Sequence, residues 1–174
     1  MKRIARFSRV SEKRWEKDWC GTFEGTDVPV SRAAELYQEL RLPRRATAGS
    51  AGYDFYTPID VHLEPGQSVK IPTGMRVEMN EGWVLLIVPR SSLGFKYKLE
   101  LNNTVGVIDS DYFYSDNEGH IFIKIINSNQ EGKTVDIKAG QAFAQGIFVM
   151  YGITEDDDST EERNGGFGST DSRG

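Results

Sequence analysis

Two carboxylates follow an apolar stretch near the middle of this chain, at a point where a strand is expected to end. Asp109 and Asp111 follow the apolar residues of the segment NNTVGVIDSDYF. Side chains two positions apart on a strand point to the same side, so the pair could activate water or bind a metal ion. Two solvent-facing acids in a turn would give the same pattern. Both interpretations remain open from these residues alone.

Further residues could bind an anion or serve only the fold. Arg90, Ser91 and Ser92 in PRSSLG follow an apolar run, and a guanidinium beside hydroxyls suits charge-assisted hydrogen bonds to phosphate. In AGSAGYDF, small residues would deliver the carboxylate of Asp54 to a tight turn. In GQAFAQ, the amide of Gln145 lies inside an apolar strand, where it needs a core partner or a ligand.

The chain ends in RNGGFGSTDSRG, which carries one aromatic residue, Phe167, among glycines. Such a segment has no apolar pattern that could fold it. Composition alone therefore predicts a disordered end.

The elements that position these residues are predicted to be mainly strands. From about residue 46 the apolar pattern has a period of two, as in HIFIKIIN, where Ile121, Ile123 and Ile125 share one face. GWVLLIVP suits a strand buried on both faces, and VHLEPGQSVKIP has a Pro-Gly turn between short strands. TVDIKAGQAFAQGIFVMY indicates two strands that meet at Ala139 and Gly140. Many short strands at this spacing predict an all-β sandwich or barrel.

Two short helices are predicted before the strands begin. In VSEKRWEKDW, Ser11 is placed to cap the helix, with Val10 and Trp15 as a hydrophobic staple. In SRAAELYQEL, Ser31 is placed to cap, and Pro43 is expected to end the helix.

Composition narrows the class of protein. The chain has 174 residues, a formal charge of −5 and a single cysteine, which argues against a nucleic-acid partner, a disulfide framework and a cysteine metal cluster. The sequence has no apolar run of signal-peptide or membrane-spanning length, so we expect a cytoplasmic protein with no membrane partner. We divide it into a helical N-terminal extension (1–41), a β domain (42–153), and an acidic linker with a glycine-rich mobile C-terminal arm (154–174).

Taken together, AGYDF, RSSLG, GVIDSDY, GQAFAQ and RNGGFGST resemble the five motifs of the trimeric, all-β dUTPase family, in the family's order. The resemblance runs from about Leu42 to Thr170. One such motif would mean little, whereas five in order are specific. The resemblance implies a jelly-roll-like β-sandwich that cleaves dUTP to dUMP and pyrophosphate with Mg²⁺, by attack of water on the α-phosphorus. Such an enzyme limits dUTP and supplies dUMP.

The resemblance also implies a role for the GVIDSDY residues. Asp109 would orient and deprotonate the attacking water, and Asp111 would be its structural partner in the turn. Tyr112 would lie against the deoxyribose and leave no room for a 2′-hydroxyl.

The base itself would be recognised by an amide and by the backbone. Asn103 would bind the uracil edge through its side chain, and backbone groups of Val107 and Ile108 would complete the recognition. Cytosine presents the opposite donor pattern, so it would leave buried polar groups unpaired at about 1–3 kcal/mol each.

The other motifs would hold the triphosphate. Arg90, Ser91, Ser92 and Gln145 match phosphate-binding positions. Magnesium would be held by the phosphates and by waters, with Asp54 and Gln145 as outer-shell candidates and with no direct protein ligand.

The C-terminal tail would close over the site as a lid. Arg163 would reach the γ-phosphate, Phe167 would stack on uracil, and Gly168, Ser169 and Thr170 would bond the phosphates. In the family this tail closes over a neighbouring subunit's site, which implies a homotrimer with shared sites.

The sequence departs from the family in two of these motifs. Tyr112 leads into FYSDNEG, so we expect a longer hairpin in which DNEG forms the turn and the family's Arg is missing. Ala142 and Phe143 replace a common Arg and aliphatic residue. The related dCTP deaminases share the fold and give one alternative. A nucleotide-gated regulatory protein is another, with the basic, Trp-containing N-terminal extension binding a protein partner, although that extension could equally pack within the trimer.

Overall fold

The structure is a computed structural model that describes residues 2–161, and strands dominate it. The strands are β1 (Ala5–Arg9), β2 (Arg44–Arg45), β3 (Tyr53–Tyr56), β4 (Val61–Leu63), β5 (Ser68–Pro72), β6 (Met75–Met79), β7 (Trp83–Pro89), β8 (Leu99–Leu101), β9 (Gly106–Ile108), β10 (Phe122–Asn127), β11 (Val135–Ile137) and β12 (Ala142–Met150). The helices are α1 (Glu12–Phe23), η1 (Val30–Arg32), α2 (Ala33–Glu39), α3 (Ser91–Tyr97) and η2 (Ser110–Tyr114). The predicted all-β class, with short helices near the N-terminus, is confirmed.

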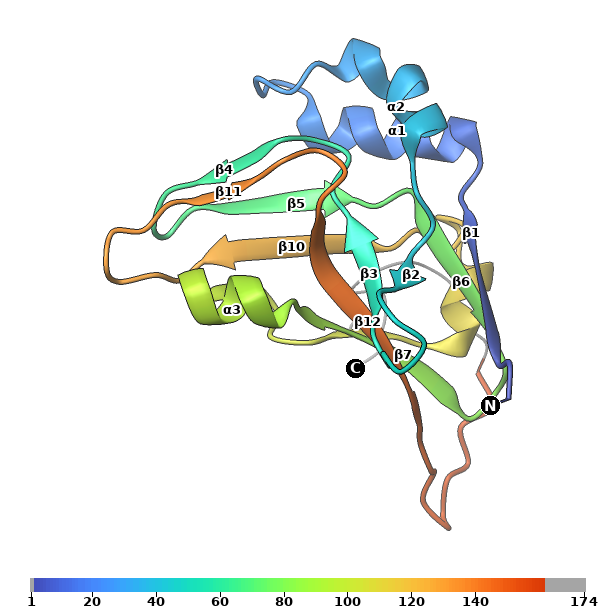
Figure 1. Cartoon of the computed structure of the whole chain (residues 1–174). Helices are drawn as coiled ribbons and strands as arrows, with labels where there is room; N and C mark the ends of the chain where they lie inside the picture. Colours follow the sequence, from blue (N-terminus) through green and yellow to red (C-terminus); the bar gives the residue numbers. More distant parts are fainter. Residues whose placement is uncertain (1, 162–174) are drawn as a thin grey trace.

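The largest sheet contains five strands in the order β2-β3-β12-β7-β9. A second sheet has the order β5-β10-β8, and the pairs β4–β11 and β1–β6 complete the described strands (Figure 1). Apolar side chains of the sheets meet in one continuous core, which includes Leu85, Ile87 and Phe143 on one side and Ile71 and Ile123 on the other. The first sheet contains the candidate site residues Asp54, Val107, Ile108 and Gln145.

Several strand predictions are confirmed, although their pairing is not the one that sequence neighbours suggest. Ile121, Ile123 and Ile125 are buried, as the period-two pattern predicts. The Pro-Gly turn does connect β4 to β5, yet β4 pairs with β11 and β5 with β10. The connection therefore passes from one sheet to another, as in a sandwich.

Helix α1 begins as the sequence predicts. The Ser11 hydroxyl accepts a hydrogen bond from the Arg14 N–H at 3.1 Å, and Val10 and Trp15 are both buried, as a hydrophobic staple requires.

The predicted start and end of the second helix are wrong by a few residues. Ser31 lies within η1, so Arg32 is the N-cap residue of α2 and its side chain makes no capping bond. The helix ends at Glu39 with Leu40 as its C-cap, before Pro43 is reached. The residues before the helix take the tighter 3₁₀ geometry that is frequent at helix ends.

The N-terminal extension also contains strand β1, which no pattern in the sequence predicts. It pairs antiparallel with β6 along its whole length, from Ala5 opposite Met79 to Arg9 opposite Met75. Helices α1 and α2 pack together beside the β domain (Figure 1). Because Trp15 is fully buried and belongs to the common core, the extension is part of the folded unit.

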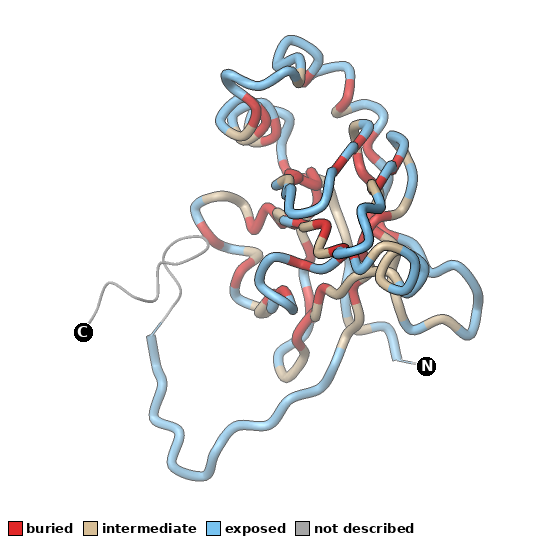
Figure 2. The backbone as a smooth tube through the Cα atoms, turned by 90° about the vertical axis from the view of Figure 1, so that its left-hand side faces the viewer, coloured by how far each residue is buried: buried red, intermediate tan, exposed pale blue. Residues whose placement is uncertain are grey.

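The chain leaves the domain after β12. Every residue from Tyr151 to Glu161 is exposed, and Figure 2 shows this segment running away from the body of the molecule. Exposed apolar side chains gather at this exit, with Met150 67% and Ile153 74% exposed. Within residues 2–161, no helix has the length and apolar character that a membrane span needs.

Candidate active site

The residues predicted to bind phosphate lie together at one end of the five-stranded sheet. Gln145 on β12 lies between Asp54 on β3 and Val88 on β7 in the strand register. Arg90 follows β7, and its Nε forms an ion pair with Asp54 Oδ1 at 3.1 Å. The Gln145 Nε2 donates to the Pro89 carbonyl at 3.1 Å. Residues that are far apart in the sequence thus form one polar cluster.

Asp54 lies within strand β3 and not in the predicted tight turn. Its side chain is 15% exposed, whereas that of Arg90 is 36% exposed, so the guanidinium contacts both the carboxylate and solvent. The small residues before Asp54 have a different purpose from the predicted one. A Cβ at Gly52 would collide with Gln145 Oε1, so glycine at this position leaves room for the amide.

Ser91 and Ser92 are the first two residues of α3, directly after Arg90. Both are exposed. Their hydroxyls therefore extend the polar cluster toward solvent.

Asp109 lies just beyond the end of β9, where it begins the η2 turn. It is half-buried, and Asp111 within η2 is exposed. The strand ends before these residues, so the predicted side-by-side geometry of two strand carboxylates is wrong, and the turn interpretation describes their backbone. Of the two carboxylates, Asp109 is the more buried.

Strand β9 is an edge strand of the five-stranded sheet. In an antiparallel pair, alternate residues of an edge strand direct their N–H and C=O groups away from the sheet. Ile108 is buried, whereas Val107 is 55% exposed. Asn103 lies before β9 in an exposed turn, with its carbonyl bonded to the Val105 N–H at 2.7 Å. The edge could pair with a planar ligand such as a base.

Tyr112 is buried, and its hydroxyl bonds within the protein. The hydroxyl donates to the His120 carbonyl at 2.7 Å and accepts from Asn117 Nδ2 at 2.7 Å. The hydroxyl therefore already has a donor and an acceptor partner within the protein. Exclusion of a 2′-hydroxyl at this residue would rest on shape and not on hydrogen bonding.

The predicted longer hairpin is not a hairpin of paired strands. Strand β9 pairs with β7, while the next strand, β10, pairs with β5 and β8. Residues 109–121, here called the 109–121 loop, cross between the two sheets through η2 and a turn. The prediction that DNEG forms the turn is confirmed, with Glu118 and Gly119 in left-handed conformations at φ 60° and 68°.

Asp109 and Arg90 lie at opposite ends of the β7–β9 strand pair. Ile108 is opposite Leu85, whereas Arg90 follows the far end of β7. Asp109 is level with Val84, six residues before Arg90, so at about 3.3 Å per residue the two backbones are on the order of 20 Å apart. One chain therefore does not bring the candidate base next to the candidate phosphate clamp.

The part of the site predicted in the tail, Arg163, Phe167, Gly168, Ser169 and Thr170, lies outside the described residues. Within residues 2–161, no group of three or more His, Cys, Asp or Glu side chains is arranged to hold a metal ion. Within the polar cluster, side-chain oxygens of Asp54 and Gln145 come from residues that are paired on neighbouring strands. Two such oxygens suit hydrogen bonds to metal-bound water better than they suit a complete Mg²⁺ coordination shell.

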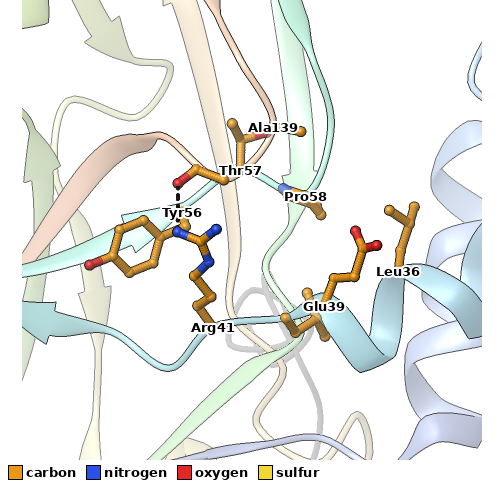
Figure 3. A pocket seen from close by; sticks show the side chains of 9 residues that line it. Leu36, Glu39, Arg41, Tyr56, Thr57, Pro58 and Ala139 are labelled. Atoms are coloured by element: carbon orange, nitrogen blue, oxygen red, sulfur yellow. Dashed lines mark hydrogen bonds between the residues drawn. The ribbon is translucent and has the colours of Figure 1, made fainter.

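A pocket of about 330 Å³ lies elsewhere, between α2 and the β domain (Figure 3). It is lined by Leu36, Glu39, Leu40, Arg41, Tyr56, Thr57, Pro58, Ala139 and Gly140. Arg41 donates to the Gly140 carbonyl at 3.4 Å and lies over the Tyr56 ring. The predicted site residues do not line this pocket.

Sequence reasoning missed one buried polar contact beside the site. His120 is fully buried and its Nδ1 lies 2.6 Å from Asp18 Oδ2 on α1. Histidine at the start of the apolar HIFIKIIN stretch was the available signal, since a buried imidazole needs partners. Its partner is distant in the sequence, so no local pattern reveals it.

The fold and the candidate site together define an all-β sandwich protein with a polar Arg–Asp–Gln cluster at one sheet end and a carboxylate after an edge strand. The dUTPase family profile matches residues 38–171. The chain belongs to the dUTPase family.

Individual relatives agree with this assignment. The chain is 42% identical over 134 residues to the deoxyuridine 5′-triphosphate nucleotidohydrolase of Lactococcus lactis, covering 75% of this chain and 88% of the relative. A crystal structure of dUTPase from Streptococcus mutans matches with a TM-score of 0.59 and 40% identity, over 67% of this chain and 91% of that one. A mutant dUTPase from phage phi11 of S. aureus, described with a structural Mg(II) ion, shares the fold at 21% identity and a TM-score of 0.60, over 91% and 98% of the two chains.

Proposed function

We propose that this protein hydrolyses dUTP to dUMP and pyrophosphate. The observation that carries the proposal is the placement of the motif residues in a member of the dUTPase family. Asp54, Arg90 and Gln145 form one polar cluster, and Asp109 follows an edge strand whose backbone could read a base.

The edge strand and the 109–121 loop would select the nucleoside. Backbone groups of Val107 and Ile108, with the Asn103 amide, would pair with the uracil edge. The ring of Tyr112 would close the space beside the sugar, because its hydroxyl is already bonded inside the loop. A ribonucleotide would then meet a surface without room for its 2′-hydroxyl.

The half-buried Asp109 would orient the attacking water and accept its proton. Arg90, Ser91, Ser92 and Gln145 would hold the phosphates, with the guanidinium neutralising negative charge. Mg²⁺ bound by the triphosphate would neutralise charge and fix the geometry for in-line attack. Asp54 and Gln145 would accept hydrogen bonds from its water ligands.

A complete site would need more than one chain. Asp109 and Arg90 are on the order of 20 Å apart within a chain, given the rise of a strand, so both cannot act on one α-phosphate there. A closed homotrimer would supply Asp109 from one subunit and the phosphate cluster from another. The exposed apolar residues Val105, Val107 and Met150 provide surface for such contacts.

The C-terminal residues would complete the site as a lid. Arg163 would bind the γ-phosphate and Phe167 would stack on uracil, with Gly168, Ser169 and Thr170 on the phosphates. A chain cut after Glu162 should fold normally and lose most of its turnover. Unchanged turnover in that variant would contradict the lid.

A substrate panel tests the proposed reaction. With Mg²⁺, the protein should release pyrophosphate from dUTP and far less from dTTP, dCTP and UTP. Asp109→Asn should still bind dUTP while losing nearly all turnover, and Asp136→Asn, an exposed β11 carboxylate that contacts His62, is the matched control. Comparable hydrolysis of dTTP would contradict the assigned base pocket.

The panel also separates the alternatives. Ammonia released from dCTP would identify a deaminase-like enzyme of the same fold. A regulatory protein that binds a partner through its N-terminal extension remains a second candidate, but Trp15 and Trp19, which suggested such a surface, are fully buried. Binding of dUTP without turnover would favour that candidate.

A further inference from the structure

Helix α1 contacts the 109–121 loop at two points. At its N-terminus, the Ser11 N–H and hydroxyl donate to the two carboxylate oxygens of Glu118 at 2.7 and 2.6 Å. Further along the helix, Asp18 bonds to His120. The two contacts lie on either side of Gly119, so the N-terminal helix fixes the backbone of the turn.

The bonds of His120 define its protonation and its direction. The Gly74 N–H donates to His120 Nε2 at 2.8 Å, so this nitrogen carries no proton. The proton therefore lies on Nδ1, which donates to Asp18 Oδ2 at 2.6 Å. The side chain of Arg14 bonds to the other oxygen of Asp18. Both ring nitrogens of His120 and both carboxylate oxygens of Asp18 are thus already hydrogen-bonded. The imidazole ring cannot rotate without breaking a buried hydrogen bond.

The His120 backbone carries this restraint to Tyr112. Its carbonyl accepts the Tyr112 hydroxyl at 2.7 Å. The same hydroxyl accepts from the side-chain amide of Asn117. The backbone carbonyl of Asn117 in turn accepts from the His120 backbone N–H at 3.1 Å. A continuous set of hydrogen bonds therefore links Asp18 on the N-terminal helix to Tyr112, whose ring the proposed function places beside the sugar.

We propose that Asp18 and His120 are positioning residues through which the N-terminal helix holds Tyr112, and that this contact sets how strongly the site rejects a ribonucleotide. The inference rests on the proposed function and deepens it. Discrimination by shape requires a ring that cannot move aside, since a misplacement of about 1 Å can change a rate by about a hundredfold. Asp18 lies outside residues 38–171, the segment that the dUTPase profile matches.

The test is the ratio of kcat/KM for dUTP to kcat/KM for UTP, both measured on the same sample. Loss of folded protein lowers both values equally and cancels from the ratio, so a merely structural role would not change it. Asp18→Ala should lower the ratio by about tenfold or more, chiefly by improving UTP, since one buried charge-assisted bond is lost. Asp18→Asn retains an oxygen that can accept from Nδ1 and should keep most of the selectivity.

Two further variants guard against a failure of Asp18→Ala to fold. Glu118→Ala removes the contact between Ser11 and the loop. Position 118 has a left-handed φ of 60°, and glutamate and alanine both carry a Cβ there, so the substitution adds no backbone strain. It should lower the ratio in the same direction. Asp60→Ala also removes a carboxylate with two hydrogen bonds, to Lys138 and the Ala139 N–H, but makes no contact with the loop and should leave the ratio unchanged.

The outcomes separate the inference from the proposed function. A wild-type protein that does not hydrolyse dUTP would overturn the proposed function and the inference with it. A wild-type protein that hydrolyses dUTP selectively, with the ratio unchanged in Asp18→Ala and Glu118→Ala, would overturn the positioning role alone. An Asp60→Ala variant that lowers the ratio as much as the other two would also contradict it.

Discussion

At the scale of single residues, the polar cluster depends on an ion pair, an amide and a glycine that come from different strands and turns. Arg90, Asp54 and Gln145 are each predictable from motif positions, and the structure joins two of them by an ion pair at 3.1 Å. The need for glycine at position 52 could not be predicted, because the atom that fills the space belongs to Gln145 on another strand. Contacts between strands depend on register, which local sequence does not encode.

Gly52→Ala should reduce activity with little effect on stability. The new Cβ would collide with Gln145 Oε1, the far end of a flexible side chain, so the amide can swing away at small cost to the fold. A displaced amide in the phosphate cluster should lower kcat/KM by roughly ten- to a hundredfold. Steady-state kinetics and the Tm check both parts.

Gly49→Ala is the matched control, because nothing lies within 4 Å of a Cβ at that position. It should retain full activity. Equal activity of the two variants would show that the placement of Gln145 does not matter to turnover.

At the scale of elements, turn chemistry was easier to predict than strand pairing. DNEG correctly indicated the turn of the 109–121 loop, because glycine and flexible polar residues mark left-handed backbone. The hairpin prediction was wrong, since the two strands around the loop belong to different sheets. Alternation of apolar residues shows that a strand exists and not which strand lies beside it. The helix cap at Ser31 failed because an η1 turn replaced the expected first turn.

Gly119→Ala should destabilise the protein by more than the cost of a left-handed alanine alone. Gly119 has φ 68°, and a Cβ there would lie 2.7 Å from the Phe113 Cα and 2.8 Å from the Tyr112 carbonyl oxygen. Both atoms are backbone and cannot move aside without opening the loop. We expect a loss of more than about 1 kcal/mol in the free energy of unfolding.

Gly132→Ala is the control for this effect. Gly132 has a similar φ of 75° with nothing within 4 Å, so it isolates the conformational cost. Urea denaturation of both variants gives the difference. A loss in Gly119→Ala no larger than in Gly132→Ala would show that the loop can relax around a methyl group.

At the scale of the whole molecule, the N-terminal extension belongs to the same core as the β domain. The sequence predicts its first helix well, because the cap and the staple are local signals. Strand β1 was missed, since ARFSR is short and polar and gains its order from pairing with β6. The buried contact from Asp18 to His120 spans 102 positions of the chain, which no local pattern can show.

That buried contact should make stability depend on pH. Burial lowers the pKa of His120 from its ordinary value near 6.5, against the opposing effect of the hydrogen bond to Asp18. Arg14 also lowers the His120 pKa and Glu118 raises it. Near the ordinary histidine pKa, His120 therefore binds a proton more readily in the unfolded chain than in the folded protein. The contribution of neutral His120 to the free energy of unfolding is fully present above about pH 6.5. It is lost as the pH falls toward the lower pKa that His120 has in the folded protein.

The Tm should therefore fall between about pH 7 and pH 5, and His120→Gln should flatten that fall. The other histidine, His62, serves as a control because its pKa is shifted in the opposite direction. Its pKa is raised by the hydrogen bond to Asp136 and by Glu64, and it is exposed, so His62→Gln should change the profile little. A wild-type Tm that does not change over this range would contradict a neutral, buried His120.

Mixing two inactive variants tests whether the site is shared between chains. Asp109→Asn and Arg90→Ala should each be inactive alone. The residues they alter lie at opposite ends of the β7–β9 strand pair. In mixed trimers, a site that takes Asp109 from one subunit and Arg90 from the next is intact when the first subunit is the Arg90→Ala variant and the second is the Asp109→Asn variant. Random mixing of equal amounts should restore roughly a quarter of the sites. Sites built within one chain would always contain one altered residue, so a mixture refolded together and still inactive would show that each chain builds its own site.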